Sequence, residues 1–238
     1  MKKGIVYRST GSWYTVESQG VFYECRIKGK LRLKGIKSTN PVAVGDRVHF
    51  EIDSHVQANE GNITQIEERQ NYIVRKSVNL SKQTHIIASN IDQVFLLVTL
   101  NNPLTFPAFI DRFLVTAEAY QIPAVLLFNK IDTYTNAELD DLKILQNIYQ
   151  EIGYVTQSIS AINGKGVDTI KTLMQDKVSM FSGHSGVGKS TLVNAISPEL
   201  ALKTAAISKQ HQQGMHTTTF AEMFALSDGI KIIDTPGI

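Results

Sequence analysis

One cysteine, Cys25, occurs among the 238 residues of the sequence. It excludes a disulfide within the chain and any zinc site built from several cysteines. Long apolar runs are also missing, because the longest, VFLLVTL at 94–100, has only the length of a strand. The N-terminus, MKKGIVYRSTG, lacks the apolar core of a secretory signal. Hydrophobic residues still make up 42% of the chain, so we expect a globular, soluble, cytosolic protein without a membrane partner.

Acidic residues are scarce near the N-terminus. Residues 1–50 contain ten Lys or Arg and three acids, 10 − 3 = +7, whereas the whole chain has a formal charge of +2. The other residues therefore sum to 2 − 7 = −5. The same N-terminal part, residues 1–70, alternates short β-branched and aromatic runs with glycine turns and shows no helical period. We predict an OB-fold-like barrel there, although an SH3-like barrel would give a similar pattern.

Within this part, RIKGKLRLKGIK at 26–37 places a cation at nearly every second position and has no acid. In an extended chain that spacing puts the cations on one face, where they repel one another unless a polyanion binds. A solvated loop with incidental charge is the alternative. The aromatics Trp13, Tyr14, Phe22 and Tyr23 are near in sequence and are more typical of core than of base stacking. The candidate RNA-binding residues are Arg26, Lys28, Lys30, Arg32, Lys34 and Lys37.

A polar linker is predicted over 71–90, and the pattern then changes over 91–238. Apolar runs of strand length alternate with helical periods, which predicts an α/β domain with a mostly parallel six-stranded sheet. Asn136 is the expected N-cap of one helix and Gly153 its stop. The predicted strands are 91–100, 122–128, 154–160, 177–183, 217–226 and 229–237, and the predicted helices are 107–120, 136–153, 166–174 and 189–197.

GHSGVGKS at 183–190 matches the phosphate-binding loop G-x-x-x-x-G-K-[ST] between a predicted strand and a predicted helix. A chance glycine-rich turn is the alternative, but the context argues against it. The glycines let successive N–H groups point at phosphate oxygens, and the helix N-terminus adds its dipole. Lys189 would contact the β- and γ-phosphates, and Ser190 would ligate Mg²⁺. The phosphate-site candidates are Gly183, His184, Ser185, Gly186, Val187, Gly188, Lys189, Ser190 and Thr191.

Two later motifs complete the phosphate end. DTPG at 234–237 ends an apolar strand, so Asp234 suits a place at Mg²⁺ and the Gly237 N–H suits the γ-phosphate. Between the loop and DTPG lies GMHTTT at 214–219, where Thr218 is the expected Mg²⁺ ligand. A threonine run alone is more often simply strand. The predicted Mg²⁺ ligands are therefore Ser190, Thr218 and Asp234.

FNKID at 128–132 has the pattern N-K-x-D, which is a frequent chance match when it stands alone. Here it follows a predicted buried strand, and SAING at 160–164 follows the next. Asp132 can accept hydrogen bonds from guanine N1–H and the N2 amino group, and a buried carboxylate without those donors costs about 1–3 kcal/mol. Asn129 and Lys130 would support the loop and cover the ring. Ser160 and Ala161 belong to a loop whose backbone N–H would recognise guanine O6.

Both base-recognition loops precede the phosphate loop, which is the reverse of the usual GTPase order. A circular permutation explains this, because recognition depends on where strand ends lie in space and not on chain order. NKID, SAING, GHSGVGKS, GMHTTT and DTPG, behind a basic barrel, resemble the RsgA (YjeQ) family of small-subunit ribosome biogenesis GTPases over essentially the whole chain. The resemblance implies an OB-fold that binds ribosomal RNA, GTP hydrolysis stimulated by the 30S subunit, and a role in its late maturation.

The resemblance also implies a C-terminal zinc-binding domain with Cys and His ligands. The printed sequence stops at Ile238, so we expect a truncated chain that holds no zinc. Ile238 follows DTPG, where many GTPases place a water-orienting Gln, so slow intrinsic hydrolysis is expected. His216 is the candidate for orienting water, with a merely structural histidine as the alternative. The candidate catalytic residues are His216, Thr218 and Lys189.

Three functions remain open from the sequence. The first is a GTPase that binds the 30S subunit through 16S rRNA and leaves after hydrolysis. The second is an RNA-binding module that nucleotide switches with little turnover. The third is a permuted GTPase of large-subunit assembly, which the basic N-terminal barrel disfavours. A monomer is the default expectation.

Overall fold

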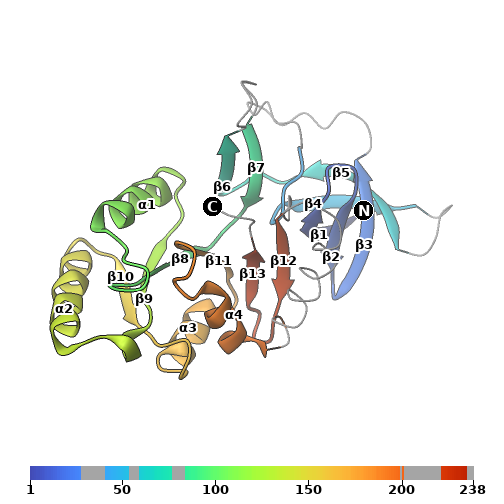
Figure 1. The fold of residues 1–238 in the computed structure, drawn as a ribbon. Coiled ribbons are helices and arrows are strands. Elements are labelled where there is room, and N and C mark those ends of the chain that lie inside the picture. The colour runs from blue at the N-terminus through green and yellow to red at the C-terminus, as the bar shows by residue number, and fades with distance from the viewer. Residues whose placement is uncertain (28–40, 54–58, 77–83, 199, 201–220, 235–238) are drawn as a thin grey trace, which may run out of the picture. The chain divides into compact units, whose positions relative to one another are not determined.

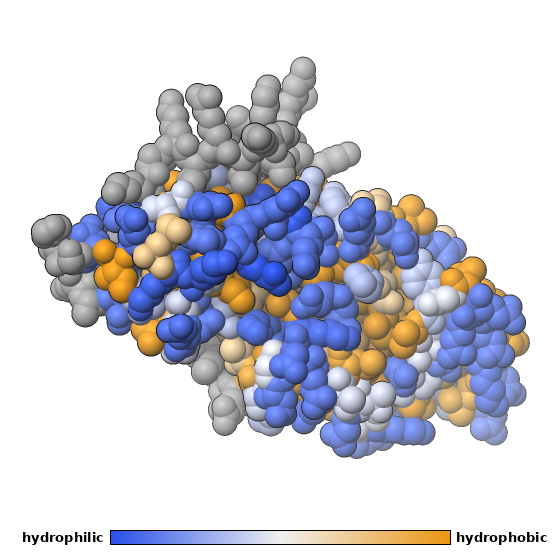
Figure 2. Space-filling model, turned by 180° about the vertical axis from the view of Figure 1, so that it is seen from behind, coloured by the Kyte–Doolittle hydropathy of each residue, from blue (hydrophilic) through white to orange (hydrophobic). Residues whose placement is uncertain are grey.

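The computed structural model describes all of the chain except residues 28–40, 54–58, 77–83, 199, 201–220 and 235–238. The chain divides after Ile91 into two compact units, and the last two strands contribute residues to both. Each of the other strands belongs to one unit (Figure 1). In the described part, no helix is both long and apolar enough to cross a membrane. Hydrophilic residues cover much of the face seen in Figure 2.

The first unit contains the predicted barrel. Strand β1 pairs with β2 and β4, β2 with β3, β3 with β5, and β5 with β4, so the five strands close on themselves. Only the β3–β5 pair is parallel among these pairings. This closed five-strand order confirms the OB-fold-like prediction. The strands are β1 (Lys2–Ser9), β2 (Tyr14–Ser18), β3 (Val21–Ile27), β4 (Arg47–Ile52) and β5 (Glu60–Ile66).

Alternate residues of these strands point into the barrel, as the period of two requires. Tyr14 and Val16 of β2 and Tyr23 and Cys25 of β3 are buried with Phe50 of β4. Tyr14 and Tyr23 are therefore core residues, as the sequence pattern indicates. Phe22 is half exposed, and its ring contacts Tyr7 edge-on at 5.3 Å between centroids.

The Cys25 thiol provides a probe of barrel opening. Burial, with a smaller contribution from the Glu24 charge, raises its pKa to about 12. We therefore expect a negligible reaction with a thiol-specific disulfide reagent at pH 8 in the folded protein, and one reacting thiol after denaturation. Absorbance of the released thiol measures this. Rapid labelling in buffer without denaturant would show that the barrel opens far more readily than its core implies.

Residues 71–90, which the sequence presents as a polar linker, contain two antiparallel strands, β6 (Tyr72–Lys76) and β7 (Thr84–Ser89). A buried carboxylate ties them to the barrel. Asp46 accepts hydrogen bonds from the Arg69 guanidinium, the Ser89 hydroxyl and the Ala43 N–H. The Asp46 and Arg69 side chains are 0% and 5% exposed, so each needs the other to remain charged out of water.

The second unit contains the α/β domain. β8, β9, β10 and β11 form parallel pairs in the order β10-β9-β8-β11. The Lys231 N–H donates to the Lys177 carbonyl, which places the start of β13 beside the start of β11. The order continues from β11 through β13 to β12, so the mostly parallel sheet with six strands is as predicted, although parts of β12 and β13 belong to the first unit. The strands are β8 (Gln93–Val98), β9 (Ala124–Phe128), β10 (Val155–Ser158), β11 (Val178–Ser182), β12 (Glu222–Ala225) and β13 (Lys231–Asp234).

Helices α1 (Pro107–Ala119) and α2 (Asn136–Glu151) pack on one face of this sheet, where they bury apolar residues against β8 and β9. The predicted N-cap Asn136 is wrong by one residue. Thr135 caps α2, because its hydroxyl accepts from the Glu138 N–H while the Glu138 carboxylate accepts from the Thr135 N–H, a capping box. The other helices are the 3₁₀ turn η1 (Ile131–Thr133), α3 (Val167–Met174) and α4 (Lys189–Ile196).

Candidate nucleotide site

The phosphate loop connects β11 to α4 in the predicted context. Gly183 follows β11 with φ +142°, and a Cβ there would lie 2.4 Å from the Leu97 carbonyl oxygen. The loop therefore packs directly against β8. The Lys189 ammonium donates to the Gly183 carbonyl and, at 2.9 Å, to the His184 carbonyl. Burial lowers the pKa of Lys189, because its charge is partly removed from water.

Asn129 connects the base loops to the phosphate loop. Its side chain is buried, and its Nδ2 donates to the Val187 carbonyl at 2.8 Å. Its Oδ1 accepts from the Ala161 N–H at 3.0 Å. A Cβ on Gly188 would lie 2.4 Å from Asn129 Nδ2, so glycine is required where the two loops meet. Asn129 thus holds N-K-x-D, the Ser-Ala loop and the phosphate loop in one arrangement.

Asp132 lies in η1 at the carboxyl end of β9, and its carboxylate accepts a short hydrogen bond from the Ser160 hydroxyl. Ser160 is fully buried, whereas Asp132 is exposed. The cost of a buried carboxylate without donors, argued from the sequence, therefore applies to Asp132 only when a bound base covers it. Lys130 adopts a left-handed conformation (φ +65°), and its ammonium donates to the Asn102 carbonyl at 2.6 Å.

Replacing Asn129 by alanine tests this connection. The Val187 carbonyl and the Ala161 N–H would lose buried partners, so we expect the free energy of unfolding to fall by roughly 2–4 kcal/mol. Nucleotide affinity should fall with it, because the two loops lose their common anchor. Denaturant unfolding followed by circular dichroism, and titration with fluorescent GDP, measure the two effects.

Asn194→Ala is the matched control, since Asn194 is exposed on α4 and its loss should change stability by less than about 0.5 kcal/mol. If Asn129→Ala behaved like this control, the hydrogen bonds of Asn129 would not hold the loops.

The segment between β8 and α1 also contacts the site, and the sequence motifs do not reveal it. Pro103 lies 3.7 Å from where a Gly186 Cβ would be, and the Asn102 carbonyl receives Lys130. The Phe109 ring of α1 packs against the exposed His184 ring, tilted by 32° and with 3.8 Å between centroids. The only sequence signal is position, since this segment follows the carboxyl end of a parallel strand, where ligands bind in α/β sheets.

The remaining predicted residues fall into two groups. Ser190 and Thr191 are exposed on the first turn of α4, Ser185 and Gly186 are exposed in the loop, and Asp234 is exposed at the end of β13. Arg26 is exposed on β3. The other predicted site residues lie outside the described part of the chain, and their roles stay predictions. They are His216, Thr218, Gly237, Lys28, Lys30, Arg32, Lys34 and Lys37.

Comparison with known proteins accounts for this arrangement. A family profile described as the RsgA GTPase matches residues 66–238, and one described as the RsgA N-terminal domain matches residues 3–63. The chain belongs to the RsgA GTPase family.

Curated family members are similar over nearly the whole chain. The "Small ribosomal subunit biogenesis GTPase RsgA" of Christiangramia forsetii is 66% identical over 99% of this chain and 75% of its own length. The protein of the same name from Bacteroides fragilis is 56% identical over 99% of this chain and 76% of its own.

Solved structures of this family share the fold. YjeQ from Thermotoga maritima matches with a TM-score of 0.76 and 33% identity, covering 99% of this chain and 74% of its own. YloQ, titled a circularly permuted GTPase, matches with a TM-score of 0.72 and 28% identity, covering 100% of this chain and 71% of its own. The predictions of family, barrel and permuted GTPase domain are therefore confirmed. FNKID is part of a permuted RsgA-type GTPase domain and not a chance match.

Proposed function

We propose that this chain binds and hydrolyses GTP and thereby controls its binding to the small ribosomal subunit during late maturation. The observation that carries the proposal is Asn129, which is hydrogen-bonded both to the phosphate loop and to the Ser-Ala loop. A base loop tied in this way to a phosphate loop fits one guanine nucleotide spanning both. The small ribosomal subunit is the proposed partner because the similar proteins of Christiangramia forsetii and Bacteroides fragilis are named for its biogenesis.

In this proposal Asp132, oriented by Ser160, accepts from guanine N1–H and the N2 amino group. The backbone N–H groups of 183–188 and the N-terminus of α4 bind the phosphates. Lys189 exchanges its carbonyl contacts for the β- and γ-phosphate oxygens. Lys130 covers the base while its ammonium holds the Asn102 carbonyl.

Mg²⁺ is part of the proposal. The Ser190 hydroxyl is exposed beside Lys189, and the Asp234 carboxylate is exposed at the end of its strand. With Thr218 these residues would supply only oxygen donors, which is the kind that Mg²⁺ prefers. The ion would neutralise charge on the β- and γ-phosphates. We propose Thr218 and Asp234 as residues that respond to the γ-phosphate, and His216 as the residue that orients water.

The barrel is the proposed contact to 16S rRNA, through Arg26 and the basic residues that follow it in sequence. Its charge of +7 over residues 1–50 supports a polyanionic partner. We further propose that the protein acts as a monomer in the cytoplasm and uses no zinc within these residues.

Co-sedimentation with separated 30S and 50S subunits tests the proposal. We expect binding to 30S in the presence of a non-hydrolysable GTP analogue and much weaker binding with GDP. Binding to 50S alone would overturn the assignment to the small subunit. A phosphate-release assay with and without 30S separates the enzyme from a nucleotide-switched module, because the module would show no stimulated release.

A further inference from the structure

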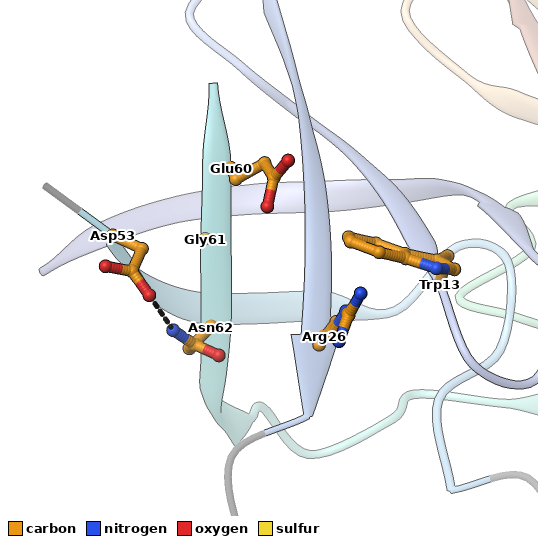
Figure 3. A pocket seen from close by; sticks show the side chains of 6 residues that line it. All are labelled: Trp13, Arg26, Asp53, Glu60, Gly61 and Asn62. Carbon is orange, nitrogen blue, oxygen red and sulfur yellow. Dashed lines mark hydrogen bonds between the residues drawn. The ribbon is translucent and has the colours of Figure 1, made fainter. Parts of the chain in front are cut away.

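A pocket of about 270 Å³ lies on the outer surface of the barrel, far in sequence from every nucleotide motif. It opens over the parallel strands β3 and β5 (Figure 3). Side chains from the β1–β2 loop, from β3, from the end of β4 and from β5 meet there. The lining residues are Trp13, Arg26, Asp53, Glu60, Gly61 and Asn62.

The strand pattern determines which residues face the pocket. Gly61 faces the barrel core, where a Cβ would meet the Glu51 carbonyl oxygen at 2.9 Å and the Cys25 sulfur at 3.2 Å. Its neighbours Glu60 and Asn62 therefore point outward. Asn62 is paired with Arg26 of β3, so both belong to the same outer face.

Trp13 and Arg26 lie against each other on one side of the pocket, and together they are called the Trp13–Arg26 surface. The Arg26 guanidinium lies over the Trp13 ring at 3.9 Å from its centroid. The β1–β2 loop is held by Thr10, whose hydroxyl accepts from the Trp13 N–H at 3.3 Å and whose N–H donates to the Trp13 carbonyl at 3.0 Å. Indole and guanidinium planes are the surfaces on which proteins stack unpaired RNA bases.

Carboxylates provide the polar side of the pocket. Figure 3 shows the Glu60 carboxylate directed toward the side where Trp13 and Arg26 lie. Asp53 is contacted by the Asn62 amide at 3.5 Å. A carboxylate can accept two hydrogen bonds in parallel from guanine N1–H and N2–H, whereas uracil flanks its single N–H with two carbonyl oxygens that repel it.

We propose that this pocket binds one unpaired guanine base of an RNA segment, stacked on the Trp13–Arg26 surface and recognised by Glu60. Its volume is below the roughly 300–1,000 Å³ of ordinary small-molecule sites, so it suits a single base. RNA is favoured over an arginine side chain of a protein because the barrel as a whole is basic: residues 1–50 sum to +7 and residues 51–70 to 1 − 5 = −4, which leaves 7 − 4 = +3 over residues 1–70. The inference rests on the proposed binding of rRNA by the barrel and names the base that it recognises.

Trp13 is the only tryptophan of the chain, so its fluorescence reports this pocket directly. The experiment uses the 238-residue chain saturated with GDP, so that the nucleotide site is occupied. The probe is an oligouridine that contains one guanosine, and the matched probe contains inosine, which lacks only the N2 amino group. We expect the guanosine oligomer to quench Trp13 fluorescence at concentrations about tenfold lower than the inosine oligomer does.

Glu60→Gln should bring the two affinities close together, because the amide accepts only one of the two hydrogen bonds. Glu51→Gln, the same change at an exposed position of β4 outside the pocket, should keep the preference for guanosine. Equal thermal midpoints of the two variants would show that both are folded.

Equal affinity of the unchanged protein for both oligomers would overturn the inference. So would a change of Trp13 fluorescence that depends on Glu60 and is produced by arginine amide but not by RNA, since the pocket would then recognise a protein side chain. Co-sedimentation with 30S distinguishes a failure of the pocket assignment from a failure of the proposed function. If the chain sediments with 30S but shows no guanosine preference, only the pocket assignment fails, whereas loss of 30S binding itself removes the proposed function.

Discussion

Asp132→Asn is expected to change the nucleotide preference from guanine to xanthine. In the structure the Ser160 hydroxyl donates to one Asp132 oxygen, and an asparagine can keep that hydrogen bond through its own Oδ1. The second oxygen would become an NH₂ group, which opposes the N2 amino group of guanine donor to donor. Xanthine has a carbonyl oxygen at that position and would accept from the new amide. Guanine would lose its hydrogen bond from the N2 amino group, would face a donor there, and would keep only a neutral acceptor for N1–H, so GDP binding should weaken roughly 100-fold.

Titration of the variant with fluorescent GDP and its xanthosine counterpart measures both sides of this change. Asp140→Asn, at an exposed position of α2, removes the same charge away from the site and should leave GDP affinity unchanged. Equal loss of both nucleotides in Asp132→Asn would mean that the carboxylate holds the loop together and does not recognise the base.

The sequence is sufficient to locate the loops of the nucleotide site because strand ends are local signals. β9 is a run of apolar residues directly before Asn129, and β11 directly precedes Gly183. Loops at the carboxyl ends of parallel strands converge on one edge of a sheet, whatever their order in the chain. The order of the motifs along the chain therefore reveals the permutation by itself.

The hydrogen bonds between those loops cannot be predicted in the same way. The sequence pattern assigns Asn129 to the support of its own loop, but its amide also bonds the Val187 carbonyl, 58 residues later. Such a partner depends on how closely two strand ends approach, which no spacing encodes. For the same reason the sequence does not reveal Phe109 against His184 or Asn102 against Lys130.

Competition between neighbouring residues explains the wrong N-cap. Asn136 and Thr135 are both good N-cap residues, and Glu138 decides between them because it lies three residues after Thr135. The strands β6 and β7 are short and their sequence is polar, so their pattern resembles a linker. On the barrel, the sequence pattern predicts that Arg26 binds RNA as one of several cations, and it does not reveal that the Arg26 guanidinium lies over the Trp13 ring.

Lys189→Met is expected to separate function from stability in this domain. The Lys189 ammonium is partly buried, and burial lowers its pKa because only neutral carbonyl oxygens of Gly183 and His184 receive it. A charge held by neutral acceptors is costly to bury, while methionine keeps the length and apolar stem of the side chain. We therefore expect the thermal midpoint of the free protein to stay the same or rise slightly.

GTP hydrolysis, in contrast to stability, should be strongly impaired by Lys189→Met. Without the ammonium, the β- and γ-phosphates lose a fixed positive charge beside the reacting bond, and kcat/KM for GTP should fall by roughly 10²–10³-fold. Lys143→Met, on the exposed surface of α2, makes the same chemical change and should alter neither quantity. Steady-state phosphate release measures kcat/KM, and a thermal melt without nucleotide measures the midpoint. A clear drop in the midpoint for Lys189→Met would mean that its carbonyl contacts stabilise the loop. An unchanged kcat/KM would exclude the ammonium from the phosphate site.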